Sequence, residues 1–203
     1  MTYEQIMNDR RAVNFFDINK DISESLLKEI IDVAVLAPSA FNLQPWRLIA
    51  VKSKEAKEKL QPLAFNQPKI SEAPVTLILV ADRNGFDASN PIWDHLKVAI
   101  GEEGTQSAMG SAAFLYGSSE DRKIKFSQSN SGILAMSIMA AAKDKGVDSH
   151  PMSGMDFDGV KAAFALKESE EVVMLIALGY HDVSKELFPR GYRRKAVEIL
   201  EWV

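Results

Sequence analysis

A loop of small and amide residues between positions 37 and 47 carries the groups best suited to chemistry in this chain. Ser39, Asn42 and Gln44 supply one hydroxyl and two amides within this short stretch. Such groups donate and accept hydrogen bonds, so they suit the polar edge of a flat ring. The alternative interpretation is an ordinary proline-bounded loop in which Trp46 fills the core, and composition alone favours that alternative.

Two further positions carry positive charge next to apolar segments. Arg10 and Arg11 are adjacent and precede the apolar turn at positions 12–16. Each guanidinium offers a planar fork of donors that matches phosphate oxygens, so the pair is a candidate anion clamp. Lys69 lies just ahead of an apolar run, where a cofactor would find a strand entrance. Taken singly, both patterns also fit solvated surface charges, which are more common.

Several self-sufficient catalytic motifs are absent. No G-x-G-x-x-G follows a strand, and no P-loop lysine, H-E-x-x-H or G-x-S-x-G is present. His95, His150 and His181 are scattered without zinc-ligand spacing, and there is no cysteine, so neither a metal site nor a catalytic side chain is predicted. His150 has a second interpretation as a residue near a site. The pattern favours a cofactor that brings its own reactivity.

Hydrophobic periodicity predicts the elements that position these residues. Ser23 is a suitable N-cap for an amphipathic helix, which Pro38 ends because the residue before a proline avoids the α region. Continuous apolar runs at 74–81 and 172–179 predict fully buried strands. A long helix is expected at 121–145, with Gly146 as its stop. Shorter helices are expected at 3–10, 54–60, 91–100 and 157–164, and short strands at 48–51 and 147–152.

Two segments are less well determined. Residues 105–116 are rich in small side chains and fit either a tightly packed helix or a mobile cover of a site. Residues 196–203 alternate loosely between apolar and polar, which predicts an edge strand. Together the elements predict one α+β domain over residues 1–203, with about four strands covered by helices.

Composition limits the class of protein. The chain has 203 residues, 46% of them hydrophobic, and a formal net charge of -4. The acidic balance argues against nucleic acid as a partner, and the lack of a basic block argues against a membrane anchor. The longest uncharged run, 126–142, is too short and too polar to span a bilayer. The first twenty residues carry several charges and no secretory signal, so a cytoplasmic protein is expected.

Four segments in order along the chain resemble a known family. They are Asp9-Arg10-Arg11-Ala12-Val13-Asn14-Phe15-Phe16, Ala37-Pro38-Ser39-Ala40-Phe41-Asn42-Leu43-Gln44-Pro45-Trp46, Pro151-Met152-Ser153-Gly154-Met155-Asp156 and Pro189-Arg190-Gly191-Tyr192-Arg193-Arg194. This order is similar to that of the FMN-dependent nitroreductases, in particular the small bacterial NAD(P)H nitroreductases. The resemblance runs from Asp9 to Trp202.

The resemblance implies a fold and an activity. The fold would be α+β, with helices around a mixed central sheet, in an intertwined homodimer whose C-terminal strand crosses to the partner's sheet. FMN would lie at the dimer interface. NADH or NADPH would reduce FMN in a ping-pong cycle, and a nitroaromatic, a quinone or a similar small acceptor would then reoxidise it.

The resemblance also implies which residues hold FMN. The phosphate and ribityl chain would be bound by Arg10 and Arg11 with Arg193 or Arg194, and Ala12 and Asn14 would follow in the same segment. The other subunit would line the flavin with Pro38, Ser39, Ala40 and Asn42. The pyrimidine edge and ribityl would be held by Asn66, Gln67 and Lys69. The region near flavin N5 would be formed by Met152, Ser153 and Gly154.

Two departures from the family pattern keep a second function in view. Many relatives have Ser where this chain has Ala12, and Lys or Arg where it has Asn14. Loss of that cation bears on the flavin potential. The leading hypothesis is an FMN-dependent NAD(P)H oxidoreductase. The alternatives are an FMN-binding carrier or sensor without nicotinamide turnover and, third, a structural dimerisation module that binds nothing.

Overall fold

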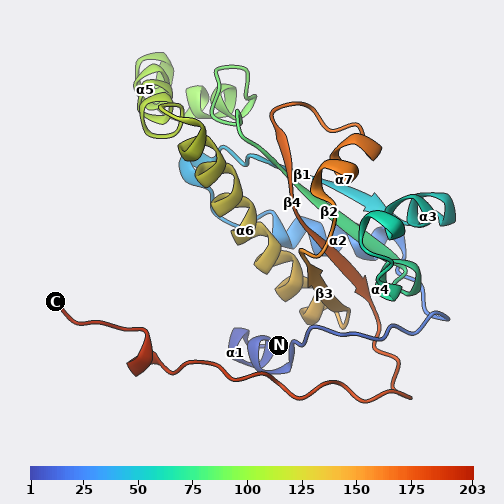
Figure 1. Ribbon diagram of the computed structural model, residues 1–203. Helices are drawn as coiled ribbons and strands as arrows, with labels where there is room; N and C mark the ends of the chain where they lie inside the picture. Colours follow the sequence, from blue (N-terminus) through green and yellow to red (C-terminus); the bar gives the residue numbers. More distant parts are fainter.

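The computed structural model describes residues 1–203, and its helices cover both faces of a four-stranded sheet (Figure 1). The α-helices are α1 (Tyr3–Asp9), α2 (Glu24–Ala34), α3 (Lys54–Leu63), α4 (Pro68–Glu72), α5 (Ile92–Tyr116), α6 (Glu120–Asp144) and α7 (Phe157–Ala163). The strands are β1 (Trp46–Val51), β2 (Val75–Asp82), β3 (Asp148–Met152) and β4 (Glu170–Gly179). Two short 3-10 turns are η1 (Ala40–Asn42) and η2 (Ala196–Glu198).

The sheet confirms the predicted α+β class. Its strand order is β1-β2-β4-β3, and every neighbouring pair is antiparallel. The resemblance implies a mixed sheet, but within this chain the sheet is antiparallel throughout. Hydrophobic patterns alone locate strands and do not fix their directions. Parallel pairing occurs only at an isolated bridge between Ala12 and Ser149.

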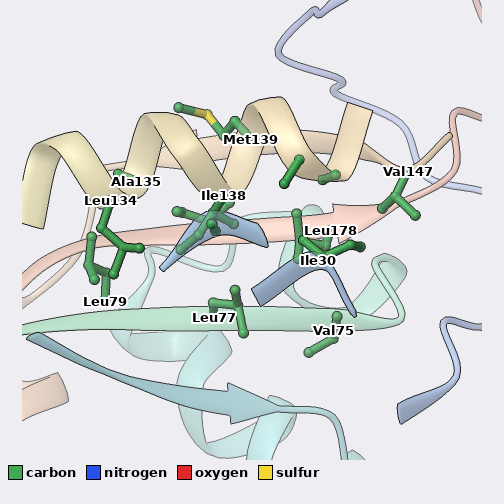
Figure 2. Packing of buried hydrophobic residues seen from close by; sticks show 14 of the residues in the cluster. Ile30, Val75, Leu77, Leu79, Leu134, Ala135, Ile138, Met139, Val147 and Leu178 are labelled. Carbon is green, nitrogen blue, oxygen red and sulfur yellow. The ribbon is translucent and has the colours of Figure 1, made fainter. Parts of the chain in front are cut away.

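The central strand β2 is buried on both faces, as its continuous apolar sequence predicts. Leu77 and Leu79 belong to the core under α2 and α6, whereas Ile78 and Val80 belong to the core under α3, α4 and α7. This division follows from the pleat, which sends successive side chains to opposite faces. Figure 2 shows Ile138 of α6 in the first of these cores. The sheet is thus a rigid middle layer between two helical layers.

Local signals start several helices and stop α6, whereas α2 ends at Ala34, before the Pro38 that the sequence predicts as its end. Ser23, Ser53 and Asp156 accept hydrogen bonds from backbone amides three residues on, as N-caps do. Gly146 follows the end of α6 with φ 74°, a conformation that glycine adopts without steric cost.

The segment 105–116 forms the second half of α5, so it is helical, but it is not tightly packed because only Thr105 and Ala112 within it are buried. Gly101, with φ 77° and ψ 174°, divides α5 into two helical parts. Thr105 is buried and its hydroxyl donates to the carbonyl oxygen of Gly101 at 2.8 Å, which fixes the start of the second part. No helix, including the long α5 and α6, is both long and apolar enough to cross a membrane.

The C-terminal segment corrects one prediction. Residues 196–203 form η2 and an irregular end, not the expected edge strand, and every residue from Phe188 onward is exposed. A strand needs a neighbouring edge to pair with, and this segment runs past α1 instead of along the chain's own sheet (Figure 1). Within a single chain the edge-strand prediction is therefore wrong.

A buried carboxylate joins β1 to the start of β4. Glu170 is only 3% exposed and accepts hydrogen bonds from Nε and Nη2 of Arg47 at 2.7 and 2.8 Å. The backbone amide of Lys167 donates to the same carboxylate at 2.8 Å. These contacts, the Arg47 bond foremost, hold the pKa of Glu170 below its ordinary value.

Replacement of Arg47 by methionine is expected to lower the free energy of unfolding by about 2 kcal/mol, because it leaves a buried charge without its cation. Because the pKa of Glu170 is lowered in the folded protein, its carboxylate stabilises the fold at pH values above the ordinary pKa of 4.5. This contribution is lost as the pH falls through the lowered pKa of the folded state. The variant should therefore be less stable than the parent at neutral pH, and the difference between the two proteins should shrink in acid.

Urea unfolding of both proteins across the acid-to-neutral range tests this prediction. Lys54→Met removes an exposed pair with Glu58 and serves as the control, with an expected change below about 1 kcal/mol. An Arg47→Met loss no larger than that of the control, or equal at every pH, would contradict the proposed role.

Candidate functional site

Basic residues from the two ends of the chain meet beside the C-terminal end of α1. A capping box of Thr2 and Gln5 starts this helix, and Arg10 ends it in an extended conformation, with φ -63° and ψ 130°. The guanidinium of Arg190 donates to the carbonyl oxygens of Asn8 and Arg10 at 2.5 and 3.1 Å. Arg11 in turn donates to the carbonyl oxygen of Phe188. These contacts fix the C-terminal segment against the helix.

The cluster has the electrostatics of an anion site. Burial, followed by the charges of Arg190 and Arg193, lowers the pKa of Arg10 from its ordinary value. The only arginines in ion pairs are Arg47 and Arg83, so no carboxylate balances this cluster. The Nε of Arg10 is buried without a hydrogen-bond partner. Converging cations with an unused buried donor are an arrangement that a phosphate or carboxylate stabilises.

The segment after Arg11 continues along the edge of the sheet. The amide of Val13 donates to the carbonyl oxygen of Ser149 on β3 at 3.1 Å. The carbonyl oxygen of Val13 accepts from Nδ1 of His150 at 2.8 Å, which fixes the proton on Nδ1 because a carbonyl only accepts. Ala12 is exposed, and the Asn14 side chain reaches only the Ala12 carbonyl, at 3.5 Å.

The predicted ring-edge residues lie next to this segment. Lys69 makes no ion pair, and its charge together with burial lowers the pKa of His150, with burial the larger cause. Gln67 Nε2 donates to the carbonyl oxygen of Gly154 at 2.8 Å, which joins the start of α4 to the end of β3. Ser153 and Gly154 are exposed, whereas Met152 is buried. One continuous region therefore contains the Arg10 cluster, Lys69 and residues 152–154.

Gly154 does not need to be glycine for the chain's own packing. Its φ lies outside the left-handed region, and an added Cβ would meet its nearest neighbour, Gln67 Nε2, at an ordinary 3.5 Å. A positive φ is therefore not the reason for a glycine at this position. Room for a ligand remains as a reason for its small size.

The 37–47 loop lies apart from this region in the single chain. Ser39 Oγ accepts from the amide of Gln44 at 3.0 Å, and the amide of Ala40 donates to Oδ1 of Asn130 on α6 at 2.9 Å. Pro38 and Asn42 are exposed, and Trp46 is half-buried rather than a core plug. No hydrogen bond or ion pair connects Pro38, Ser39, Ala40 or Asn42 to the Arg10 cluster.

Backbone strain marks the 37–47 loop and the turn between α3 and α4. Six residues other than glycine have positive φ, and five of them lie here: Phe41, Asn42, Gln44, Phe65 and Asn66. Such conformations are costly for side chains with a Cβ and gather at functional sites. Because sequence patterns rarely reveal positive φ outside glycine, this signal emerges only from the structure.

Sequence reasoning underrated two residues. Arg190 stands in the C-terminal motif, but only the structure shows its bonds to the end of α1. His150 stands between Val13 and Lys69, a position that the -His-Pro- sequence only hints at. Arg194, by contrast, is exposed and has no hydrogen bond, whereas Arg193 lies near enough to Arg10 to affect its pKa.

Comparisons with known proteins identify the family. A model described as the Nitroreductase family matches residues 7–180, so the chain belongs to the nitroreductase family. The chain is 31% identical, over 99% of its length and 98% of the relative's, to "Putative NAD(P)H nitroreductase MhqN" of Bacillus subtilis. It is 35% identical, over 84% of its length and 82% of the relative's, to a protein of Thermus thermophilus named NADH dehydrogenase.

A solved structure shows the same fold. The nitroreductase of Exiguobacterium sibiricum, determined in complex with FMN, superposes with a TM-score of 0.87. It shares 26% sequence identity, over all of this chain and 97% of its own. The sequence-based assignment to the family is confirmed, and with it the assignment to an oxidoreductase family.

Proposed function

We propose that this protein is an FMN-dependent NAD(P)H oxidoreductase that reduces nitroaromatics, quinones or similar small acceptors by a ping-pong hydride mechanism, with residues 1–203 acting as one FMN-binding domain. The observation that carries the proposal is the unpartnered buried Nε of Arg10 within a carboxylate-free cluster of arginines. This is where a phosphate would be bound. Family membership and the FMN complex of the Exiguobacterium relative support the same cofactor.

The residues present fit FMN at both of its ends. Arg10, Arg11 and Arg193 would bind the phosphate, and Arg194 is the weaker candidate because it has no contact with the cluster. Lys69, Gln67 and Asn66 would face the ribityl chain and the pyrimidine edge, with Ser153 and Gly154 beside the reactive edge of the ring. When bound, FMN supplies the chemistry, since it takes hydride from a nicotinamide and passes reducing equivalents to an acceptor.

The protein's own part is to bind the ring and to set its charge environment. The pKa of His150 is lowered by burial and by Lys69, so its imidazole is neutral at pH 7 and adds no second cation there. The Val13 carbonyl holds this imidazole in place. Lys69 then remains as the cation that stabilises the negative charge the ring acquires with electrons.

A homodimer completes the proposal. The loop with Pro38, Ser39, Ala40 and Asn42 would reach the flavin from the partner subunit. Large apolar side chains on the C-terminal segment have no partner in their own chain, and Trp202 is 87% exposed. Exposed apolar patches mark interaction surfaces. The C-terminal segment would then find in the partner's sheet the edge that it lacks in its own.

The Lys69→Met variant is expected to retain FMN but to make the flavin harder to reduce. A charge-assisted contact contributes about 1.5–3 kcal/mol, so the two-electron midpoint potential should fall by about 30–60 mV. Equilibrium dye titration measures this shift. Lys54→Met changes an exposed lysine of α3 and should leave the potential unchanged. A Lys69→Met potential equal to that of the parent protein would remove Lys69 from the flavin site.

Anaerobic titration tests the function itself. The FMN-loaded protein is mixed with NADH or NADPH in separate cuvettes, and a quinone or a nitroaromatic compound is then added. Bleaching of the flavin band followed by its return on addition of acceptor is the expected result.

The carrier or sensor function is the second candidate. It is favoured by Asn14, which places a neutral amide where many relatives have a cation. The Asn14 side chain donates only to the carbonyl oxygen of Ala12. Bound flavin that neither nicotinamide bleaches would establish this candidate in place of the enzyme. Failure to bind FMN at all would exclude both.

A further inference from the structure

A cavity of about 490 Å³ lies between the C-terminal end of α5 and the N-terminal half of α6. Ligand pockets commonly have volumes of about 300–1,000 Å³, so a single-ring compound would fit. The cavity is lined by Ala40, Leu115, Tyr116, Arg122, Lys125, Phe126, Ser129 and Asn130. None of these side chains is acidic.

Aromatic side chains form one wall of this cavity. The rings of Tyr116 and Phe126 stack with centroids 4.4 Å apart and an interplanar angle of 23°. Phe41 packs edge-on against Tyr116, at 6.2 Å and 77°, and so holds that ring from the side. Phe126 itself is buried. A fixed aromatic wall of this kind favours a planar aromatic ligand.

Two cations without an ion pair line the same cavity. Arg122 and Lys125 stand three residues apart on α6, so they share one face of the helix. Neither is in an ion pair, and Arg122 donates only to the carbonyl oxygen of Leu115, at 3.3 Å. Lys123, between them in sequence, pairs with Glu120 at 2.7 Å and does not line the cavity. The two free cations therefore suit an anionic group on the ligand.

The cavity is physically joined to the loop proposed to line the flavin. Asn130 is buried, accepts from the amide of Ala40 at 2.9 Å and donates to the carbonyl oxygen of Phe126 at 2.6 Å. One amide side chain thus connects the flavin-lining loop to the aromatic wall. A ligand in the cavity would lie directly beside that loop.

We propose that this cavity is the acceptor site and that Arg122 and Lys125 select planar aromatic acceptors that carry a carboxylate. The proposal deepens the proposed function and rests on it, since the acceptor must meet the flavin beside Ala40. The carboxylate would bind between the two cations and the ring would lie against Tyr116 and Phe126. The guanidinium fork of Arg122 matches a carboxylate in geometry as well as in charge.

Binding to the oxidised, FMN-loaded protein tests the site without turnover. Calorimetry compares 4-nitrobenzoate with the neutral analogue 4-nitrobenzamide at low ionic strength. The parent protein is expected to bind the benzoate about 10-fold more tightly, and added salt should reduce the preference. The double variant Arg122→Gln/Lys125→Gln should bind the two compounds equally. The Lys123→Gln control, which removes a neighbouring cation outside the cavity, should keep the preference.

Each result has a defined meaning. Equal affinities in the parent protein, or a preference that survives the double substitution, would overturn the proposal. So would a double variant that loses affinity for the non-reducing NADP⁺ instead of for the benzoate, because the cations would then serve the nicotinamide. Both residues are exposed, so folding of the double variant should be unaffected, and its thermal unfolding is the check.

Turnover of the neutral compound separates this proposal from the proposed function. If NAD(P)H reduces 4-nitrobenzamide equally well through the parent and the double variant, the enzyme function holds and the selectivity alone is at issue. If neither compound is reduced while the binding preference is present, the proposed function fails with these acceptors and the anion-selective cavity is retained.

Discussion

Replacement of Arg10 by glutamine is expected to weaken FMN binding by about 100-fold and to leave riboflavin binding nearly unchanged. The Nε of Arg10 is buried and unpartnered, so a phosphate would be its hydrogen-bond acceptor. A charge-assisted bond contributes about 1.5–3 kcal/mol, and 1.4 kcal/mol corresponds to tenfold in affinity. Quenching of flavin fluorescence during titration measures both dissociation constants.

The comparison of the two flavins makes this result specific. Riboflavin lacks the phosphate, so equal weakening of both ligands would point to a damaged fold rather than to a lost phosphate contact. Lys28→Gln changes an exposed lysine of α2 and is the surface-charge control. Because burial and two neighbouring arginines oppose the charge of Arg10, the flavin-free Arg10→Gln protein should be no less stable than the parent.

Removal of residues 190–203 is expected to abolish tight FMN binding and to leave a monomer. The deletion takes away Arg190 and Arg193 of the basic cluster and the unpartnered apolar side chains of the C-terminal segment. All the deleted residues are exposed, so the core should still fold, and the midpoint of thermal unfolding of the flavin-free chain should change by only a few degrees. Light scattering and flavin titration measure the two losses.

A full-length variant separates the two effects of that deletion. The Ile199→Asp/Trp202→Asp variant would break the apolar contacts of the proposed dimer and leave the arginines in place. This variant should be monomeric and should keep the phosphate contacts of its own chain while it loses those of the partner's loop. A truncated protein that stays dimeric and binds FMN at full strength would refute both roles of the segment.

The sequence predicts the elements well because their signals are local. The continuous apolar run of β2, the N-cap Ser23 and the stop at Gly146 each depend on neighbours along the chain, and each is found as predicted. Strand directions depend on pairing across the sheet, so the antiparallel order is not readable from the chain. The edge strand expected at 196–203 is absent for a related reason, because loose alternation along the chain does not show whether a sheet edge is available to pair with.

The candidate site is harder to predict from the sequence because its residues come from distant segments of the chain. The sequence predicts Arg10 and Arg11 as a candidate anion clamp, but only the structure shows that Arg190 and Arg193 lie close to Arg10. Two lysines near the α5–α6 cavity illustrate the same limit. Lys123 and Lys125 look alike in sequence, and their difference lies in whether Glu120 is within reach.

The contact between Arg190 and the carbonyl of Arg10 joins residues 180 positions apart, nearly the full length of the chain. A ribosome makes Arg10 180 residues before it makes Arg190. The sheet and its helices have all their residues before the basic cluster is complete, and N-terminal parts of proteins generally fold first during synthesis. We therefore expect FMN capture to wait until Arg190 has been made and has reached Arg10. A producing cell short of free flavin would then accumulate folded, colourless protein that gains its colour when FMN is added.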